Sequence, residues 1–228
     1  MYITVSKITG QIKSISSNPI SETKTTIVFN KPEITTNRTE FLRVVKDNEG
    51  NIADVVEKSD QEKQIIIKNN VRRIRQQKIE QVHRIREEKE NGEFKINEEP
   101  EEKIEQLTLI VGDEILHLDS SFEGQSRLNS ILQSFELGIL DTSATVHWKF
   151  KDKNTGEIYY KDLTQSQLKS IASVITDYVE KLFQTESLHI NNLKNFDETD
   201  EEGIRAYDIY KEWPDSVYKF DSWNDVNV

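Results

Sequence analysis

The chain has 228 residues, of which 35% are hydrophobic and 31% are charged, and its formal net charge is −11. This charge repels phosphate backbones, which argues against nucleic acid as a partner, and the lack of cysteine excludes disulfides, thiol nucleophiles and thiolate metal ligands. No apolar run approaches the roughly 18 residues that span a membrane, and the first residues lack the apolar core of a signal peptide, so we expect neither membrane insertion nor export by a signal peptide.

The first part of the chain is predicted to form antiparallel hairpins. "YITVSKITGQIKSI" alternates apolar and polar residues on both sides of a Thr9-Gly10 turn, which is typical of two half-buried strands. A second pair, 41–45 and 52–56, surrounds the turn-forming residues 47–50. We therefore predict a small β module over residues 1–57.

A long helix is predicted next. Ser59 and Glu62 have the spacing of a capping box, Gly92 is suited to a helix C-terminus, and no proline or glycine interrupts residues 60–91. The helix is taken as a linking element over residues 58–93. Its apolar positions form one narrow stripe, typical of a coiled coil, for which we predict self-association through Ile67, Val71, Ile74, Val82 and Ile85.

Charge is unevenly distributed along the chain. Residues 68–86 carry seven basic residues and one acidic residue, whereas residues 197–228 carry ten acidic and three basic residues. The basic run is either a solvated helix face or an electropositive docking surface. Such opposite charges could orient one subunit against another.

Residues 94–212 are predicted to form an α+β domain. A short strand and an acidic loop with Pro100 come first, and "LTLIVGDEILHL" then predicts a hairpin around Gly112-Asp113. "DSSFEGQSRLNSILQSFELG" predicts a helix closed by Gly138.

The segment 145–183 is the most strongly patterned. The strand "TVHWKFK" places Trp148 and Phe150 on one face, and "EIYYKDL" returns the chain after a polar turn. Thr164 and Gln167 then have capping-box spacing. The following helix has a regular apolar seam of Leu168, Ile171, Ile175, Tyr178 and Leu182.

A search for chemistry finds no strong motif. The four histidines lack metal-binding spacing; His117 and His147 could meet on neighbouring strands, but ordinary strand residues are the favoured interpretation. The run "DETDEEG" could suggest calcium, yet Thr199 and Glu202 fit a helix cap better.

Glycoside hydrolysis would need a carboxylate pair, for which Asp113, Glu114 and Asp119 are the candidates, although acidic residues are common enough here to pair by chance. Phosphate-cradling glycine loops and nucleophile elbows are absent from the sequence. We therefore predict no catalytic, cofactor-binding or metal-binding residues and no enzymatic activity.

The C-terminal residues 213–228 crowd aromatic side chains into a short acidic segment. They either dock on a partner, pack back on the domain or form a disordered tail. Aromatic residues dominate interface hot spots, so partner docking is favoured, through Trp213, Tyr218, Phe220 and Trp223. The predicted fold class is thus α+β: an N-terminal antiparallel β module, a long amphipathic helix, and a C-terminal domain of two hairpins with three helices.

Three stretches carry a resemblance: "VGDEILHLDSSFEGQSRLNSIL", "VHWKFKDKNTGEIYYKDLTQSQLKSIASVITDYVEKLF" and "ETDEEGIRAYDI". From about Val71 onward the chain resembles an uncharacterised C-terminal domain family carried by tail and tail-fibre-associated proteins of tailed bacteriophages. The Trp148 strand and the Leu163-Thr164 step into a helix are the most specific part. The helices depart from that family in being rich in isoleucine, lysine and asparagine rather than alanine.

This resemblance implies a setting and no catalytic residues. We expect a structural protein of the virion tail, assembled in the host cytoplasm, that attaches or extends fibres at the baseplate through protein–protein contacts. A homotrimer is expected, because phage fibres are commonly trimeric. The alternatives are a tail-fibre assembly chaperone absent from the mature particle, and a carbohydrate-binding or cleaving tail-tip protein with a pocket lined by Trp148 or Trp223 beside carboxylates.

Overall fold

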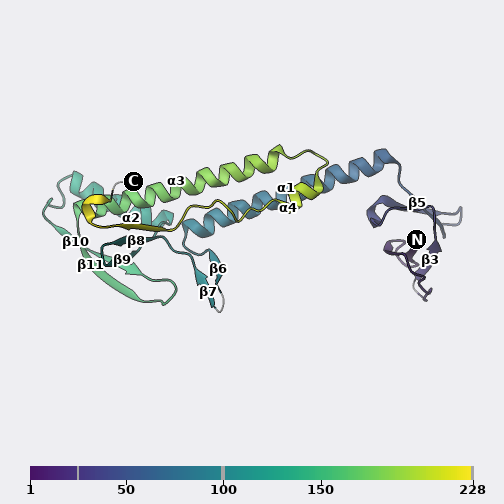
Figure 1. Cartoon of the computed structure of the whole chain (residues 1–228), viewed down its shortest axis with the longest axis horizontal. Coiled ribbons are helices and arrows are strands. Elements are labelled where there is room, and N and C mark those ends of the chain that lie inside the picture. Colours follow the sequence, from purple (N-terminus) through teal and green to yellow (C-terminus); the bar gives the residue numbers. More distant parts are fainter. Residues whose placement is uncertain (25, 99–100, 227–228) are drawn as a thin grey trace. The chain divides into compact units, whose positions relative to one another are not determined.

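The computed structural model describes residues 1–24, 26–98 and 101–226, with only the backbone described at residues 97, 98, 101 and 102. It has the predicted α+β class, with small sheets and α-helices (Figure 1). The chain falls into two compact units, which we call the N-terminal unit (Met1–Ile74 and Asp197–Arg205) and the C-terminal unit (Arg75–Phe196 and Ala206–Val228). This division differs from the four consecutive parts expected from the sequence, because the long helix belongs partly to each unit and residues 213–228 belong to the C-terminal unit.

The N-terminal unit contains two small sheets. In the first, β1 (Tyr2–Ser6) lies between β2 (Ile12–Ser16) and β3 (Thr26–Asn30). The predicted hairpin is confirmed, since Ile3 lies opposite Ile15 and Val5 opposite Ile12. Strand β3 was not predicted.

The second sheet of this unit is the predicted hairpin of β4 (Leu42–Lys46) and β5 (Ile52–Glu57), which follows the short 3₁₀ helix Thr39–Phe41. Its turn is held by the Asp47 carboxylate, which accepts from the amides of Glu49 at 2.9 Å and Asn51 at 2.8 Å. The core of the unit is formed by buried side chains of both sheets and the segment between them: Ile3, Val5, Ile34, Leu42 and Val55.

Helix α1 (Asp60–Glu90) confirms the predicted long helix and both of its ends. The Ser59 amide donates to the Glu62 carboxylate at 2.8 Å, and the Glu62 amide donates to Ser59 Oγ at 3.3 Å, which completes the capping box. At the other end Gly92 has a φ of +59°, a conformation that glycine adopts without a steric penalty. The Glu93 amide donates to Glu88 O at 2.6 Å and the Gly92 amide to Lys89 O at 3.0 Å, which is a Schellman motif.

The apolar stripe of α1 is covered within one chain. Exposure is 0% for Val71, 6% for Ile74, 0% for Val82 and 3% for Ile85, and Ile67 is half-buried. Self-association was predicted because the stripe was expected to be uncovered, and that reason is wrong. Self-association itself stays a prediction, and these four side chains are not available to a second copy while the helix keeps this packing.

The basic side chains of α1 are also paired within the chain. In the N-terminal unit, Lys68 and Arg72 lie 3.0 and 3.8 Å from Glu198. In the C-terminal unit, Arg86 and His83 lie 3.1 and 2.8 Å from Glu186. Of these two carboxylates only Glu198 belongs to the acidic region 197–228, so part of the opposite charge of the two regions is used inside the N-terminal unit. That the rest orients separate subunits stays a prediction.

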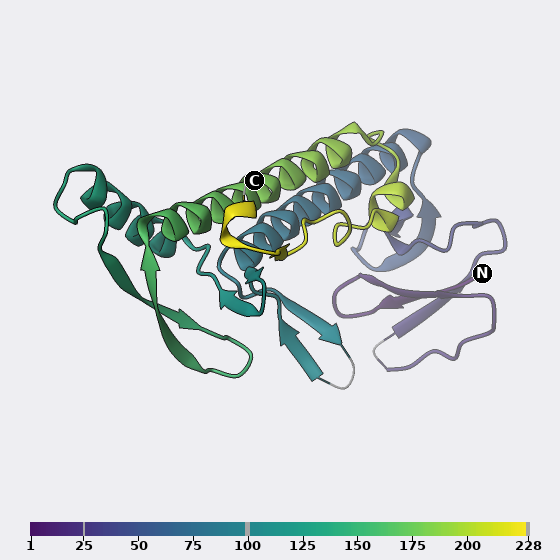
Figure 2. The same ribbon diagram turned by 60° about the vertical axis from the view of Figure 1, so that its left-hand side comes forward.

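The C-terminal unit contains the second half of α1 and α3 (Gln165–Asn195), which lie side by side (Figures 1 and 2). The two helices are antiparallel, because Arg75 donates to Phe196 O at 2.8 Å near one end while Arg86 meets Glu186 nearer the other. Thr164 and Gln167 form the predicted capping box of α3, and the seam from Leu168 to Leu182 is buried.

Three sheets complete this unit. Strands β6 (Lys95–Glu98) and β7 (Glu101–Ile104) form a hairpin where one strand and a loop were expected; Pro100 lies outside the described residues. The predicted hairpin of β8 (Thr108–Val111) and β9 (Glu114–His117) is extended by β12 (Val217–Phe220), which pairs in parallel with β8. Strands β10 (Thr145–Lys151) and β11 (Ile158–Thr164) form the two-stranded sheet predicted around the polar turn.

Helix α2 (Phe122–Glu136) packs on α3 and closes the core of the unit. Its N-terminal cap is Ser121, whose Oγ accepts from the Gly124 amide at 3.2 Å. The core joins α2 and α3 to strands β8 to β11 and includes Trp148, Phe150 and Tyr178.

The acidic run "DETDEEG" forms a cap, as favoured, but with a different residue. Helix α4 (Glu201–Ala206) is capped by Asp200, whose carboxylate accepts from the Gly203 amide at 2.8 Å, while Thr199 Oγ1 donates to Asp197. The Asp200 carboxylate lies close over Gly203, where a Cβ would be 2.2 Å from it, so a larger residue at 203 would make this carboxylate shift.

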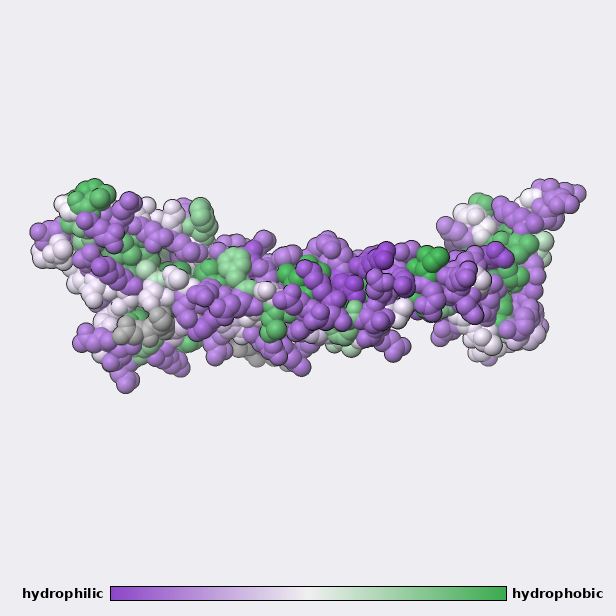
Figure 3. Space-filling model, turned by 90° about the horizontal axis from the view of Figure 1, so that it is seen from above, coloured by the Kyte–Doolittle hydropathy of each residue, from purple (hydrophilic) through white to green (hydrophobic). Residues whose placement is uncertain are grey.

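One face of the molecule is mostly hydrophilic. The face in Figure 3 shows hydrophobic residues only in small separate areas among charged and polar ones. Among the described residues, the structure contains no helix that is both long and apolar enough to span a membrane.

Candidate functional site

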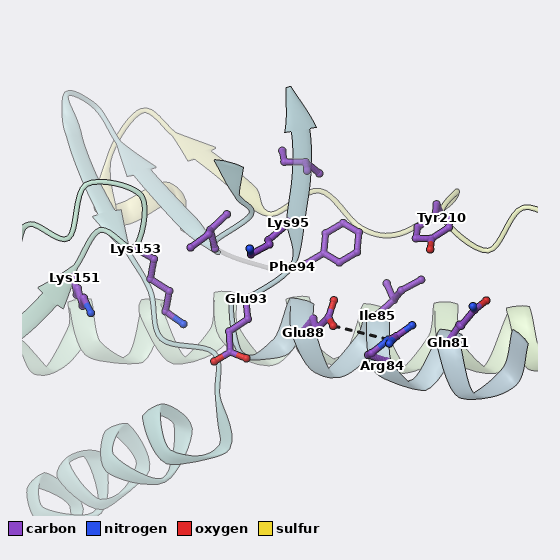
Figure 4. Close-up of a pocket in the computed structure, with 13 residues that line it drawn as sticks. Gln81, Arg84, Ile85, Glu88, Glu93, Phe94, Lys95, Lys151, Lys153 and Tyr210 are labelled. Carbon is purple, nitrogen blue, oxygen red and sulfur yellow. Dashed lines mark ion pairs between the residues drawn. The ribbon is translucent and has the colours of Figure 1, made fainter. Parts of the chain in front are cut away.

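Two adjoining hollows lie at the C-terminal end of α1. The larger, about 1170 Å³, lies against the last turns of α1 and the β6–β7 hairpin (Figure 4). The smaller, about 330 Å³, lies along β10 and beside the start of α2. Both are lined by Glu93, Lys151 and Lys153. We refer to the two together as the α1-end groove.

The end of α1 that borders the groove is closed by side chains from elsewhere in the unit. Lys153 Nζ donates to Asn91 O, and Ser120 Oγ donates to Glu90 O at 2.7 Å. A cation at this position satisfies a free carbonyl and interacts favourably with the negative end of the helix dipole. These bonds fix α1 to the β10–β11 turn and to the loop before α2.

The β10–β11 turn is attached to the segment after β7 by two amide side chains. Gln106 Nε2 donates to Lys151 O at 2.9 Å and its Oε1 accepts from the Lys153 amide at 3.0 Å. Asn154 Oδ1 accepts from the Ile104 amide at 2.7 Å while its Nδ2 donates to Ile104 O at 3.0 Å. Each amide therefore pairs with main chain as another peptide group would, and four hydrogen bonds attach this wall of the groove.

A buried ion pair lies near the larger hollow. Lys89, with a side chain 5% exposed, lies 2.6 Å from Glu105, and its Nζ lies 4.5 Å from the centroid of the Phe94 ring. Phe94 lines the larger hollow beside Ile85 and Ile96. The larger hollow thus combines apolar side chains with charged ones, including the Arg84–Glu88 pair at 4.0 Å that Figure 4 marks.

In the smaller hollow, cations outnumber carboxylates. Its lining includes Arg127, Lys149, Lys151 and Lys153, and none of these four forms an ion pair with a described carboxylate. Its carboxylates are Glu93 and Asp119. In a chain with a net charge of −11, a concave site with this balance is suited to an anionic ligand.

Tryptophan in this hollow is not arranged as a sugar platform. The Trp148 ring is 8% exposed, and the Arg127 guanidinium lies 4.8 Å from its centroid. Trp223 is not among the lining residues. A carbohydrate-binding tip protein was expected to have a pocket lined by Trp148 or Trp223 beside carboxylates. In this hollow Trp148 lies beside carboxylates, but the Arg127 guanidinium lies over its ring.

The carboxylates considered for glycoside hydrolysis are not brought together in one hollow. Asp119 lines the smaller hollow and accepts from Ser121 Oγ at 2.6 Å, whereas Glu114 lies 2.5 Å from Lys161. Asp113 is an exposed residue of the β8–β9 turn.

The histidines do not assemble either. His117 lies 3.9 Å from Asp152, and His147 lies 2.8 Å from Asp162 and stacks on Tyr160. Over the described part of the chain, no three histidine, aspartate or glutamate residues are placed to hold a metal ion.

The residues predicted to dock a partner pack against their own domain. All four, Trp213, Tyr218, Phe220 and Trp223, are half-buried against the core of the C-terminal unit. Trp213 Nε1 donates to Ile209 O at 2.9 Å, and its ring lies 5.4 Å from that of the buried His189. Partner docking through these residues stays a prediction, and only their outward faces remain for it.

Tyr218 joins this segment to α3 by a short hydrogen bond. Its hydroxyl donates to Asp177 at 2.6 Å, and Lys181 lies 2.6 Å from the same carboxylate. Burial and the adjacent Asp177 carboxylate raise the pKa of Tyr218. The pKa of Asp177 is lowered despite partial burial, because Lys181 and Tyr218 both donate to it.

Sequence reasoning missed Gln106, Asn154 and Lys153 as the residues that shape the groove. Glutamine and asparagine in a polar segment carry no pattern that indicates a long-range pair with main chain. The alternation of lysines in "WKFKDK" was a usable signal, because residues two apart lie on the same side of a strand.

Comparison with known proteins gives one match. A family model matches residues 73–209, which is more than half of the chain and includes both hollows apart from Tyr210. Neither the curated proteins nor the solved structures contain a match. The chain belongs to the family described as Domain of unknown function (DUF4376).

Proposed function

We propose that this protein is a non-enzymatic structural component of the virion tail of a tailed bacteriophage, where it attaches or extends fibres at the baseplate through protein–protein contacts. The phage setting is supported by the sequence resemblance from about Val71 onward. The attachment role is supported by the construction of the chain.

The observation that carries the attachment role is that one continuous helix is shared by two units with separate cores. Helix α1 spans 31 residues, about 46 Å at 1.5 Å per residue, and its residues belong first to the N-terminal and then to the C-terminal unit. Each unit buries its own apolar side chains. Such a chain can hold one partner at each unit without either contact disturbing the other core.

The proposed assembly is a homotrimer that contacts other tail or baseplate proteins. Because the stripe of α1 is covered within the chain, copies would meet through other surfaces. Ile65 on α1 is one such surface residue, with 60% of it exposed.

Two measurements test the proposal. Mass spectrometry of purified phage particles is expected to find this protein in stoichiometric amounts, and light scattering of the isolated protein is expected to give the mass of a trimer. Absence from finished particles would refute the structural role and favour the assembly chaperone. A monomer in solution would refute the homotrimer and leave the attachment role to single copies.

A further inference from the structure

Strand β10 has an open edge that faces the smaller hollow. In the described part of the chain it pairs only with β11, in a two-stranded sheet. The Asp152 amide donates to Glu157 O at 2.9 Å, so the even-numbered residues of β10 are the ones bonded to β11. The main-chain groups of the odd-numbered residues, His147, Lys149 and Lys151, therefore point away from β11.

One end of this edge already shows how a peptide would bind there. Gln106 donates to Lys151 O and accepts from the Lys153 amide, which are the two bonds that a residue of an adjacent strand would make. Among the described residues, no side chain or loop is bonded in the same way to the main chain of His147 or Lys149 on this edge. The edge is thus closed at one end and open along the rest.

The neighbouring strand β9 shows the contrast. Its outer edge is blocked by Tyr159, whose hydroxyl accepts from the His117 amide at 3.1 Å and donates to Ile115 O at 3.0 Å. A strand edge left without such a plug is a template for pairing with another chain. Of these two edges, that of β10 is therefore the one where an added strand fits.

The charges around the open edge select the added strand. Lys149 and Lys151 are exposed, lie on the same face of β10, and have no carboxylate partner among the described residues. Both lysines line the smaller hollow, and so do Trp148 and Phe150 from the opposite face of β10. An acidic side chain of the added strand would meet the two lysines, and an uncharged or apolar one would lie on the face of Trp148 and Phe150, since side chains alternate between faces.

We propose that the open edge of β10 binds an extended acidic segment of a partner protein by strand addition, with main-chain hydrogen bonds to His147 and Lys149 and ion pairs to Lys149 and Lys151. This form of recognition gives affinity through the main chain and specificity through alternate side chains. This inference rests on the proposed attachment role, because it states the chemistry of one partner that the attachment would involve.

The test uses the full chain and a short fluorescent peptide in which glutamate alternates with valine. We expect saturable binding by fluorescence anisotropy and slower hydrogen exchange of the Lys149 amide. Combined Lys149→Glu and Lys151→Glu substitution is expected to weaken binding by about tenfold or more, because two attractions become repulsions. Lys169→Glu, which changes an exposed lysine of α3 outside both hollows, is the matched control and is expected to leave the affinity unchanged.

Two further peptides separate strand addition from simple charge attraction. Methylation of alternate backbone nitrogens, in the phase that faces β10, removes the donors and is expected to abolish binding. A peptide with lysine in place of glutamate is expected not to bind. Equal binding of the methylated peptide, unchanged affinity of the doubly substituted protein, or no binding of the glutamate peptide would each overturn the inference.

The particle inventory described above distinguishes this inference from the proposed function. If the protein is present in particles but the glutamate peptide does not bind, the strand-addition site is refuted while the structural role stands. If the peptide binds but the protein is absent from particles, the site stands and the partner is one met during assembly.

Discussion

Tyr178 provides the sharpest test of the packing of the C-terminal unit. Its side chain is 0% exposed in the middle of α3, and its hydroxyl has no hydrogen-bond partner among the described residues. Burial raises the pKa of Tyr178, so the hydroxyl stays protonated and neutral at physiological pH. The protein therefore buries a polar group that water would have solvated in the unfolded chain.

Tyr178→Phe removes that hydroxyl and keeps the ring. Leaving a buried polar group unsatisfied costs about 1–3 kcal/mol, so we expect the substitution to stabilise the protein by up to this amount. For a protein of this size each kcal/mol corresponds to roughly 2–4 °C in melting temperature. Urea unfolding and thermal unfolding followed by circular dichroism measure the change.

Tyr159→Phe is the matched control with the opposite sign. The Tyr159 hydroxyl makes two bonds, to the His117 amide and to Ile115 O, and its loss leaves both main-chain groups without their partner. Because neither bond is fully buried, we expect a destabilisation of about 0.5–1.5 kcal/mol for each bond lost. If Tyr178→Phe destabilises the protein as much as Tyr159→Phe does, the hydroxyl of Tyr178 has a partner and the reasoning fails.

Three further predictions test the stripe, the buried ion pair and the N-terminal unit. Val71→Asp places a carboxylate at a fully buried position and is expected to cost about 3 kcal/mol or more in unfolding free energy. An unchanged unfolding free energy, together with a smaller mass by light scattering, would contradict this. Lys89→Met is expected to cost about 3–5 kcal/mol in urea unfolding because it leaves Glu105 without its cation, and adding Glu105→Leu should recover part of the loss. Hydrogen bonds from Lys63 and the Thr35 amide hold the pKa of Glu57 below its usual 4.5. The stability that these bonds contribute is therefore present above pH 4.5 and is lost as the pH falls through the folded-state pKa. The unfolding free energy of Lys63→Met should depend less on pH in this range, and an unchanged pH dependence would count against the Lys63–Glu57 pair.

Local chemistry made much of the fold predictable. The ends of α1 and the start of α3 follow from capping boxes whose partners are three residues apart, Ser59 with Glu62 and Thr164 with Gln167. The hairpins follow from alternation of apolar residues around turns rich in glycine, asparagine and aspartate. These interactions are completed within a few residues, so the sequence contains all of their parts.

The candidate site was much less predictable. The open edge of β10 is defined as much by Gln106, 45 residues before Lys151, as by the strand itself. That β9 is blocked and β10 is not depends on Tyr159 reaching His117 across 42 residues. Neither relation leaves a periodic signal in the sequence.

The sequence by itself determined the α+β class, the long helix and its caps, the hairpins, and the presence of apolar stripes that something must cover. Only the tertiary structure decided what covers them: the stripe of α1 is buried within the chain, and the aromatic C-terminal segment adds a parallel strand to β8 instead of leaving the domain. The reason is that burial is non-directional and any apolar surface satisfies it, so a pattern shows that a surface needs a partner without showing which one. That choice depends on contacts such as Arg75 with Phe196, which lie 121 residues apart in the chain.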